Sequence, residues 1–187
     1  MAHGSPDPAV RRARIADVPK IKSLVDSDAG RVLLEKELVT LYEDVQEFWV
    51  AELDGELVGC GALHVLWEDL AEIRTVAVDR RMRGRGIGHA LVARLIELAR
   101  ELGLPRLFVL TFETTFFARH GFTKIDGTPV PNEVYEEMRR SADTGVAEFL
   151  DLPFVKPNTL GNARMLLDLR ESGIDRPGTA HHHRTVE

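Results

Sequence analysis

Residues that could hold a phosphate gather in one short segment, Arg83-Gly84-Arg85-Gly86-Ile87-Gly88. This segment follows a run of strand-forming residues, Glu72–Val78, and opens a strongly helical run. Alternating glycines let the backbone curl tightly and leave successive N–H groups uncovered. At the start of a helix those donors lie at the positive end of the helix dipole, which suits an anion. We therefore predict a phosphate-binding loop; an ordinary glycine-rich turn is the alternative.

The glycine spacing separates this loop from two common nucleotide-binding motifs. It is neither G-x-G-x-x-G with a downstream acid nor G-x-x-x-x-G-K-[ST], which disfavours dinucleotide binding and P-loop chemistry. The loop resembles the (Gln/Arg)-x-x-Gly-x-(Gly/Ala) pyrophosphate loop of the GNAT family of N-acetyltransferases. Arg83, Gly86 and Gly88 fill its three fixed positions. The resemblance implies acetyl-CoA as the co-substrate.

Composition indicates an ordinary soluble globular protein. The chain has 187 residues, of which 44% are hydrophobic and 29% charged, and this length suits one domain. A net charge of -6 and the lack of a long Lys/Arg block argue against a nucleic-acid partner. The single cysteine, Cys60, fits a reducing compartment. No apolar run is long enough to cross a membrane, and Met1–Pro8 has no signal-peptide core, so we expect a cytoplasmic protein without a membrane partner.

Polar ends flank the expected domain. Residues 1–8 and 171–187 are predicted to be disordered tails, and residues 9–170 a single domain. Three consecutive histidines, His181–His183, lie in the second tail and are more often incidental than metal-binding. We therefore expect no metal. A homodimer is compatible with the sequence.

Hydrophobic periodicity and turn signals predict alternating strands and helices. Asp17 is a candidate N-cap for a helix that contains Val18, Ile21, Leu24 and Val25. Asp54-Gly55 suits a type I′ hairpin turn. Strands are predicted at Val10–Arg14, Phe48–Leu53, Leu57–Leu66, Glu72–Val78, Arg106–Thr111, after Gly121-Phe122, and at Glu148–Val155 and Arg164–Leu169. Further helices are predicted at Leu33–Val45, Gly86–Leu102, Thr114–His120 and within Pro129–Thr144.

This order of elements also resembles the GNAT fold, an α/β fold whose central, mostly antiparallel sheet is splayed and flanked by helices. In that fold the strands before the glycine loop and after the long helix separate, and acetyl-CoA lies between them. The strand edge then pairs with the pantetheine amides; a fully paired core strand is the alternative for that segment. The resemblance implies cofactor contacts from Val76, Ala77, Val78, Arg83, Gly84, Arg85, Gly86, Ile87, Gly88 and His89.

Glu72 stands where several GNAT enzymes carry a glutamate general base, in the pattern Glu-Ile-x-x-x-Ala-Val. An amine must lose its ammonium proton before it attacks a thioester. A carboxylate among apolar neighbours has a raised pKa and can accept that proton directly or through water. A salt bridge, with Arg74 for example, is the structural alternative.

The chain departs from the family at the usual general acid. Many members have a tyrosine in Phe-Tyr-x-x-x-Gly-Phe, whereas this chain has Phe117 at that position. Leu110-Thr111 and the aromatic pair resemble N-acetylglutamate synthases, in which the hydroxyl residue is a proposed acid. The resemblance gives Thr111 that role, as a hydrogen-bond donor to a thiolate that leaves readily. A threonine that caps the following turn is the alternative.

Residues 10–169 as a whole resemble the short N-acetylglutamate synthases that lack a kinase-like domain. Lys36 falls where that family has an arginine that binds the amino acid's carboxylate, and Asn158, Asn162 and Arg164 fall in its C-terminal motif. Glutamate has two carboxylates, so Lys36, Arg74 and Arg164 are the candidate cations. For each, an exposed surface charge is the alternative.

The resemblance implies an amino-acid N-acetyltransferase that converts acetyl-CoA and L-glutamate to N-acetyl-L-glutamate and CoA, the entry to arginine synthesis. Glutamine or another amino acid stays open, because Lys36 and Ala163 replace an arginine and a serine of the family. A protein or peptide acetyltransferase and a non-catalytic acyl-CoA sensor are the other two alternatives.

Overall fold

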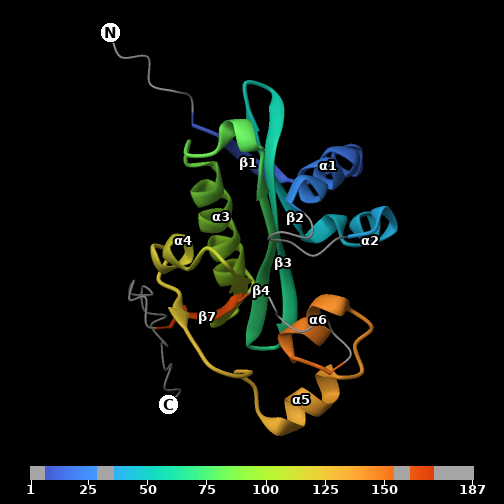
Figure 1. Ribbon diagram of the computed structural model, residues 1–187, viewed down its shortest axis with the longest axis vertical. Coiled ribbons are helices and arrows are strands. Elements are labelled where there is room, and N and C mark those ends of the chain that lie inside the picture. Colours follow the sequence, from blue (N-terminus) through green and yellow to red (C-terminus); the bar gives the residue numbers. More distant parts are fainter. Residues whose placement is uncertain (1–6, 29–35, 154–160, 171–187) are drawn as a thin grey trace, which may run out of the picture.

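The computed structural model describes residues 7–28, 36–153 and 161–170. Within them a seven-stranded sheet has the order β1-β2-β3-β4-β5-β7-β6 and carries helices on both faces (Figure 1). The strands are β1 Ala9–Arg12, β2 Phe48–Leu53, β3 Glu56–Trp67, β4 Leu70–Val78, β5 Arg106–Thr111, β6 Thr123–Lys124 and β7 Ala163–Asp168. The α-helices are α1 Val18–Asp28, α2 Leu38–Glu43, α3 Ile87–Glu101, α4 Thr114–Ala118, α5 Asn132–Met138 and α6 Thr144–Phe149. Short 3-10 helices are η1 Ile15–Asp17, η2 Val45–Glu47 and η3 Arg80–Met82.

The sheet opens between β4 and β5. Strands β1 to β4 form an antiparallel meander, and the β2–β3 hairpin turns at Asp54-Gly55, where both residues have positive φ, as expected from the sequence. β4 and β5 are parallel and pair only over three residues, ending at Glu72 opposite Phe108. β5 then pairs with β7 along its whole length. The two strands therefore separate beyond Glu72, and the predicted splayed, mostly antiparallel sheet is confirmed.

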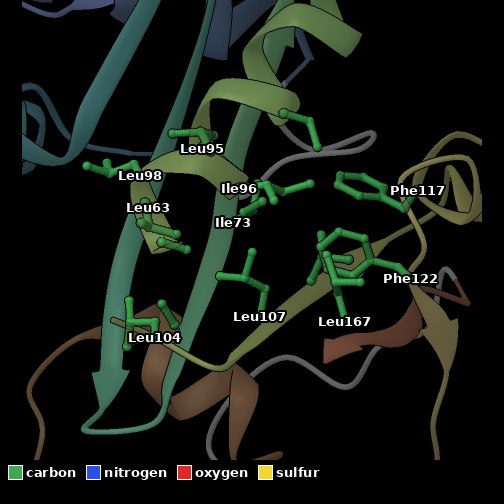
Figure 2. Close-up of a cluster of buried hydrophobic side chains, with 14 of the residues drawn as sticks. Leu63, Ile73, Leu95, Ile96, Leu98, Leu104, Leu107, Phe117, Phe122 and Leu167 are labelled. Atoms are coloured by element: carbon green, nitrogen blue, oxygen red, sulfur yellow. The ribbon is translucent and has the colours of Figure 1, made fainter. Parts of the chain in front are cut away.

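The α3 face of the sheet holds the largest core cluster. Ile73 of β4 and Leu107 of β5 pack against Leu95 and Ile96 of α3, and Phe117, Phe122 and Leu167 extend this cluster (Figure 2). Because successive strand residues point to opposite faces, Glu72 and Phe108 lie on the other side of the sheet.

Two separate clusters cover that second face. α1 and α2 bury Ile21, Val25 and Leu41 over β2, β3 and the far part of β4. α5 and α6 bury Met138 and Phe149 over Phe108 and Leu70. Figure 1 shows α1, α2 and α6 on the side of the sheet opposite α3. Glu72 thus lies on the face that the α1–α2 pair and the α5–α6 pair share.

Three predicted elements are wrong or shorter than expected. Of the predicted strand Glu148–Val155, Glu148 and Phe149 are instead the end of α6, in which Val146, Ala147 and Phe149 are buried at helical spacing, and residues 150–153 form no strand. Asp17 does not begin α1; it ends η1, and its carboxylate accepts from the Arg14 N–H and the Arg11 guanidinium. Of the helix predicted at Leu33–Val45, residues 33–35 lie outside the described residues, and α2 covers only Leu38–Glu43 of the remainder.

Several predicted features lie outside the described residues. They are most of both tails, the His181–His183 run, Asn158 and the end of the Glu148–Val155 segment. Among the helices that the structure describes, none is both long and apolar enough to cross a membrane.

Candidate functional site

A cleft of about 830 Å³ opens where β4 and β5 separate. Residues 73–76 and Val78 of β4 form one wall and residues 109–113 form the other, while the start of α3 and the aromatic residues of α4 complete the cleft. Eight of the ten residues predicted to contact the cofactor line this cleft: Val76, Val78, Arg83, Gly84, Gly86, Ile87, Gly88 and His89. The Ala77 side chain instead packs in the hydrophobic cluster that α1 and α2 form with the sheet. The Arg85 guanidinium lies 3.3 Å from Met82 Sδ.

The glycine loop ends as the N-cap of α3. Gly86 has a φ of 78°, a left-handed conformation that glycine adopts without strain, and a Cβ there would meet no atom within 4 Å. The first N–H groups of a helix have no partner within the helix, and the first turn of α3 contains no acidic residue. Backbone donors and helix dipole therefore favour an anion at this end of the cleft.

A histidine pair adjoins this loop. His89 Nδ1 lies 2.9 Å from His120 Nε2, and both rings contact Phe116. Burial, with the neighbouring His89, lowers the pKa of His120. No local sequence pattern predicts this pair, because His120 comes 31 positions after His89.

A bulge redirects β4 along the wall of the cleft. Cys60 pairs with Ala77 but Ala62 pairs with Arg74, so Gly61 alone lies opposite two residues, Thr75 and Val76. Thr75 has a φ of 58°, which is uncommon for a threonine. Bulges and strained residues of this kind recur at functional sites, where they re-aim the backbone. The sequence pattern did not predict this bulge, and a glycine within the β3 pattern is the local feature that indicates it.

Glu72 occupies the point at which the two strands part. The residue is 6% exposed, and its Oε2 is buried without a hydrogen-bond partner. Burial raises the pKa of Glu72 to about 8, although the positive charge of Arg74 opposes this shift. An uncompensated carboxyl group beside a cleft is a candidate proton acceptor.

Arg74 does not form the alternative ion pair with Glu72. Its Nη1 donates to Asp143 Oδ1 at 2.8 Å, and its Nη2 lies 3.2 Å from Asp143 Oδ2 and 3.4 Å from Glu47 Oε2. The Arg74 side chain is only 8% exposed. Its charge is therefore matched by carboxylates of the chain itself.

The other two candidate cations also have partners within the chain. Lys36 Nζ lies 3.6 Å from Asp44 Oδ2, a long ion pair. Arg164 Nε donates to the Gly127 carbonyl at 2.8 Å, Nη2 donates to the Phe149 carbonyl, and the guanidinium lies over the Phe108 ring. With Asn162, Arg164 lines a second, smaller cavity of about 280 Å³.

Thr111 and Phe117 line the far wall of the main cleft. Thr111 Oγ1 accepts a hydrogen bond of 2.9 Å from the Glu113 N–H, the capping arrangement that the sequence left as an alternative. The hydroxyl proton stays available, because the oxygen is the acceptor in that bond. Phe117 packs edge-on against Phe116 and Phe122, so the usual tyrosine position is apolar here.

Among the residues that the structure describes, no group of three or more His, Cys, Asp or Glu side chains is arranged to hold a metal ion.

The raised pKa of Glu72 predicts a pH-dependent stability. The Glu72 carboxyl group binds a proton more tightly in the folded protein than in the unfolded chain. Its contribution to the free energy of unfolding is therefore complete below about pH 4.5 and is lost as the pH rises through about 8. Glu72→Gln mimics the protonated form and should remove this loss. Between about pH 5 and pH 9 the variant should gain stability relative to wild type, by about 1.4 kcal/mol per unit of pKa shift.

Urea unfolding at several pH values measures this difference. Glu136→Gln changes an exposed carboxylate on α5 and is the matched control, with a constant offset from wild type expected. If the difference in unfolding free energy between Glu72→Gln and wild type is also constant with pH, burial does not raise the pKa of Glu72.

Three comparisons place the chain among known proteins. Residues 18–125 match the model of the "Acetyltransferase (GNAT) family". An amino-acid acetyltransferase of Mycobacterium tuberculosis is 72% identical over 165 residues, which are 87% of this chain and 95% of that protein. A solved M. tuberculosis structure in complex with CoA and NLQ is 72% identical, with a TM-score of 0.85 over 87% of this chain and 99% of that one.

A more distant structure has the same fold within a longer chain. N-acetylglutamate synthase from Neisseria gonorrhoeae, complexed with coenzyme A and N-acetyl-glutamate, is 26% identical with a TM-score of 0.69. The match covers 89% of this chain but 36% of that one. The family match over more than half of the chain, together with the splayed sheet and the glycine loop, establishes that this protein belongs to the GNAT family of acetyltransferases.

Proposed function

We propose that this protein is an amino-acid N-acetyltransferase that transfers the acetyl group of acetyl-CoA to the α-amino group of L-glutamate. The observation that carries the proposal is Glu72, a buried carboxyl with an unpartnered oxygen, at the point where the walls of the cleft meet. The names of the M. tuberculosis and N. gonorrhoeae relatives support amino acids as the substrate class.

The cleft suits acetyl-CoA in size and in the distribution of its donors. The pyrophosphate would lie on the backbone N–H groups around Gly86 and Gly88 at the start of α3, with Arg83 beside it. The pantetheine arm would follow the edge of β4 at Val76 and Val78, which β5 leaves unpaired. The co-substrate supplies an acyl group that a thioester activates.

Proton transfer is the task of Glu72. The amino acid arrives as an ammonium ion, which donates a proton to the Glu72 carboxylate and becomes a nucleophilic amine. On the other wall, the Thr111 hydroxyl would donate a hydrogen bond to the departing sulfur. A thiol with a pKa of about 8.5 leaves without a strong acid, so Phe117 in place of a tyrosine is compatible with turnover.

Lys36 is our first candidate to bind a substrate carboxylate. Its ion pair with Asp44 is long, and its side chain is 13% exposed. We keep Arg74, Arg164, Asn158 and Asn162 as proposed contributors; Arg74 and Arg164 would contribute from positions that hydrogen bonds to the chain already hold.

One observation favours L-glutamine as a second candidate. Both Nη atoms of Arg74 already face carboxylates, and Asp44, Glu47 and Asp143 make this face of the sheet rich in negative charge. A neutral side-chain amide would avoid their repulsion and could still be held through its α-carboxylate.

The cofactor loop is tested by a charge at Gly86. Gly86→Asp should abolish acetyl-CoA binding, because a carboxylate would repel the pyrophosphate at the N-cap. Gly86→Asn is the matched control: asparagine has the same shape, tolerates left-handed backbone and adds no charge. Calorimetric titration with acetyl-CoA measures both affinities. A folded Gly86→Asp variant that binds acetyl-CoA as tightly as Gly86→Asn would place the pyrophosphate elsewhere.

The base is tested by the rate of CoA release. Glu72→Gln should lower kcat by a factor of about 10²–10⁴, with acetyl-CoA affinity unchanged. Since the base must be deprotonated, wild-type kcat/KM should rise with pH up to about 8, and this acidic limb should vanish in the variant. A variant that keeps the limb would assign the base to another group.

The substrate is tested by comparing free amino acids with peptides. Lys36→Met should raise the KM for glutamate roughly ten- to a hundredfold, since a charged hydrogen bond contributes about 1.5–3 kcal/mol. The KM for acetyl-CoA should not change. If Lys36 holds the side-chain carboxylate, glutamate should suffer more than glutamine; equal losses would assign it to the α-carboxylate. Wild-type protein that acetylates peptides but no free amino acid would refute the proposed function.

A further inference from the structure

Helix α6 is attached at its N-terminal end to the strand that carries Glu72. Its N-cap, Asp143, accepts from the Val146 N–H at 2.9 Å and holds the Arg74 guanidinium through both carboxylate oxygens. Arg74 Nη1 also packs directly against Gly145. Arg74 lies two residues beyond Glu72 on β4, so the same face of the strand carries both side chains.

The C-terminal end of α6 is attached beside Glu72 as well. Phe149 packs edge-on against Phe108, with ring centroids 4.9 Å apart, and Phe108 is the residue that pairs with Glu72 across the strands. Arg164 donates to the Phe149 carbonyl and holds this end from β7. Between the two ends of α6 that are attached in this way, the charged residue of the helix is Glu148.

Glu148 is, like Glu72, a carboxyl group withdrawn from water, although it is the more exposed of the two. It is half-buried, burial raises its pKa, and its negative charge in turn raises the pKa of Glu72. Arg164 is the cation that acts on it, but the guanidinium hydrogen bonds of Arg164 are directed at the Gly127 and Phe149 carbonyls. Asp143, by contrast, is matched by Arg74, and its pKa is lowered to about 2.

Charged groups from several neighbouring elements act on this pair. They are Arg74 on β4, Asp143 at the N-cap of α6, Lys36 before α2 and Arg164 on β7. His64 lies opposite Glu72 on β3, and its ring is hydrogen-bonded to Glu47. Arg74 and Lys36 have carboxylate partners of their own, and the hydrogen bonds of Arg164 go to backbone carbonyls. A bound cation would therefore offset the desolvation of Glu72 and Glu148 and reduce the repulsion between them.

We propose that Glu148 is a second substrate-binding carboxylate, which receives the ammonium group of the amino donor together with Glu72. The inference rests on the proposed function and adds to it a residue that recognises the charge of the amine. The ammonium donates hydrogen bonds to both carboxylates; one N–H bond then breaks, its proton passes to Glu72, and the lone pair left on nitrogen attacks the acyl carbon.

The same arrangement disfavours the product. An N-acetylated amino acid has a neutral amide where the substrate had an ammonium, so it cannot neutralise Glu148. Two carboxylates therefore bind the substrate and release the product, because acetylation removes the positive charge that they recognise.

Glu148→Gln tests the proposal. The KM for the amino acid at about pH 8 should rise roughly ten- to a hundredfold, because a charged hydrogen bond is lost, while the KM for acetyl-CoA stays unchanged. The acidic limb of kcat/KM should move to lower pH, since one negative charge near Glu72 is gone. Inhibition by the N-acetylated product should become stronger relative to substrate binding.

Two further variants separate recognition from structure. Glu148→Asp keeps the charge and should leave the acidic limb close to its wild-type position. Glu136→Gln on α5 removes an exposed carboxylate and should match wild type in every measurement. Thermal unfolding of each variant identifies any loss of α6 packing.

The outcomes distinguish this inference from the proposed function. If wild type acetylates free amino acids and Glu148→Gln leaves the amino-acid KM and the acidic limb unchanged, the role of Glu148 is refuted and the function stands. Equal changes in both KM values with a lower Tm would show a structural role and would also refute the inference. Wild type without turnover of any free amino acid would remove both.

Discussion

The separation of β4 from β5 after Glu72 and Phe108 is the constraint on which the rest of the site depends. Over three residues the two strands are paired, and beyond them each wall loses its hydrogen-bonding partner on the cleft side. Unpaired backbone groups must find other partners. The cleft between them exposes such groups to a ligand that carries its own amides, while the Thr75 bulge changes the direction of β4 within the same wall.

Holding two parallel strands apart requires packing on both faces. α3 and the aromatic residues Phe117 and Phe122 fill one side, where Ile73 and Leu107 contact α3 (Figure 2). On the other side the α1–α2 pair and the α5–α6 pair cover different parts of the sheet. β7 pairs along the outer edge of β5 and keeps it in place. The cleft is thus bounded by elements that are distant in sequence.

Electrostatics divides the charged residues of the second face into two groups. Arg74 pairs with Asp143, Glu47 and Asp44, and these ion pairs attach η2 and α6 to β4. Glu72 is not part of this network, although Arg74, the cation at its centre, is only two residues further along β4. Because its carboxylate has no such partner, burial dominates its pKa. A group that is costly to ionise when the site is empty is suited to accept a proton from a cationic substrate.

Local patterns in the sequence predicted much of this protein. The Asp54-Gly55 turn, the helix after Gly86 and the buried strand at Arg106–Thr111 depend on neighbours along the chain, and the structure agrees with all three. The glycine loop needed only its spacing and its place between a strand and a helix. The prediction that Glu72 is a general base on this strand came from the resemblance to the GNAT family.

Tertiary structure alone decided which charged side chains pair with one another. The ion pair of Arg74 with Asp143 joins residues 69 positions apart, and no local pattern distinguishes such an arginine from one that is free to bind substrate. Glu148 was predicted to begin a strand, but the residues around it form a helix that Asp143 caps and that packs against Phe108 through Phe149. Most strands, the Asp54-Gly55 turn and the glycine loop before α3 depend on local residues and were predictable from the sequence. Burial, charge pairing and the Thr75 bulge depend on contacts between distant segments, which local sequence patterns do not specify.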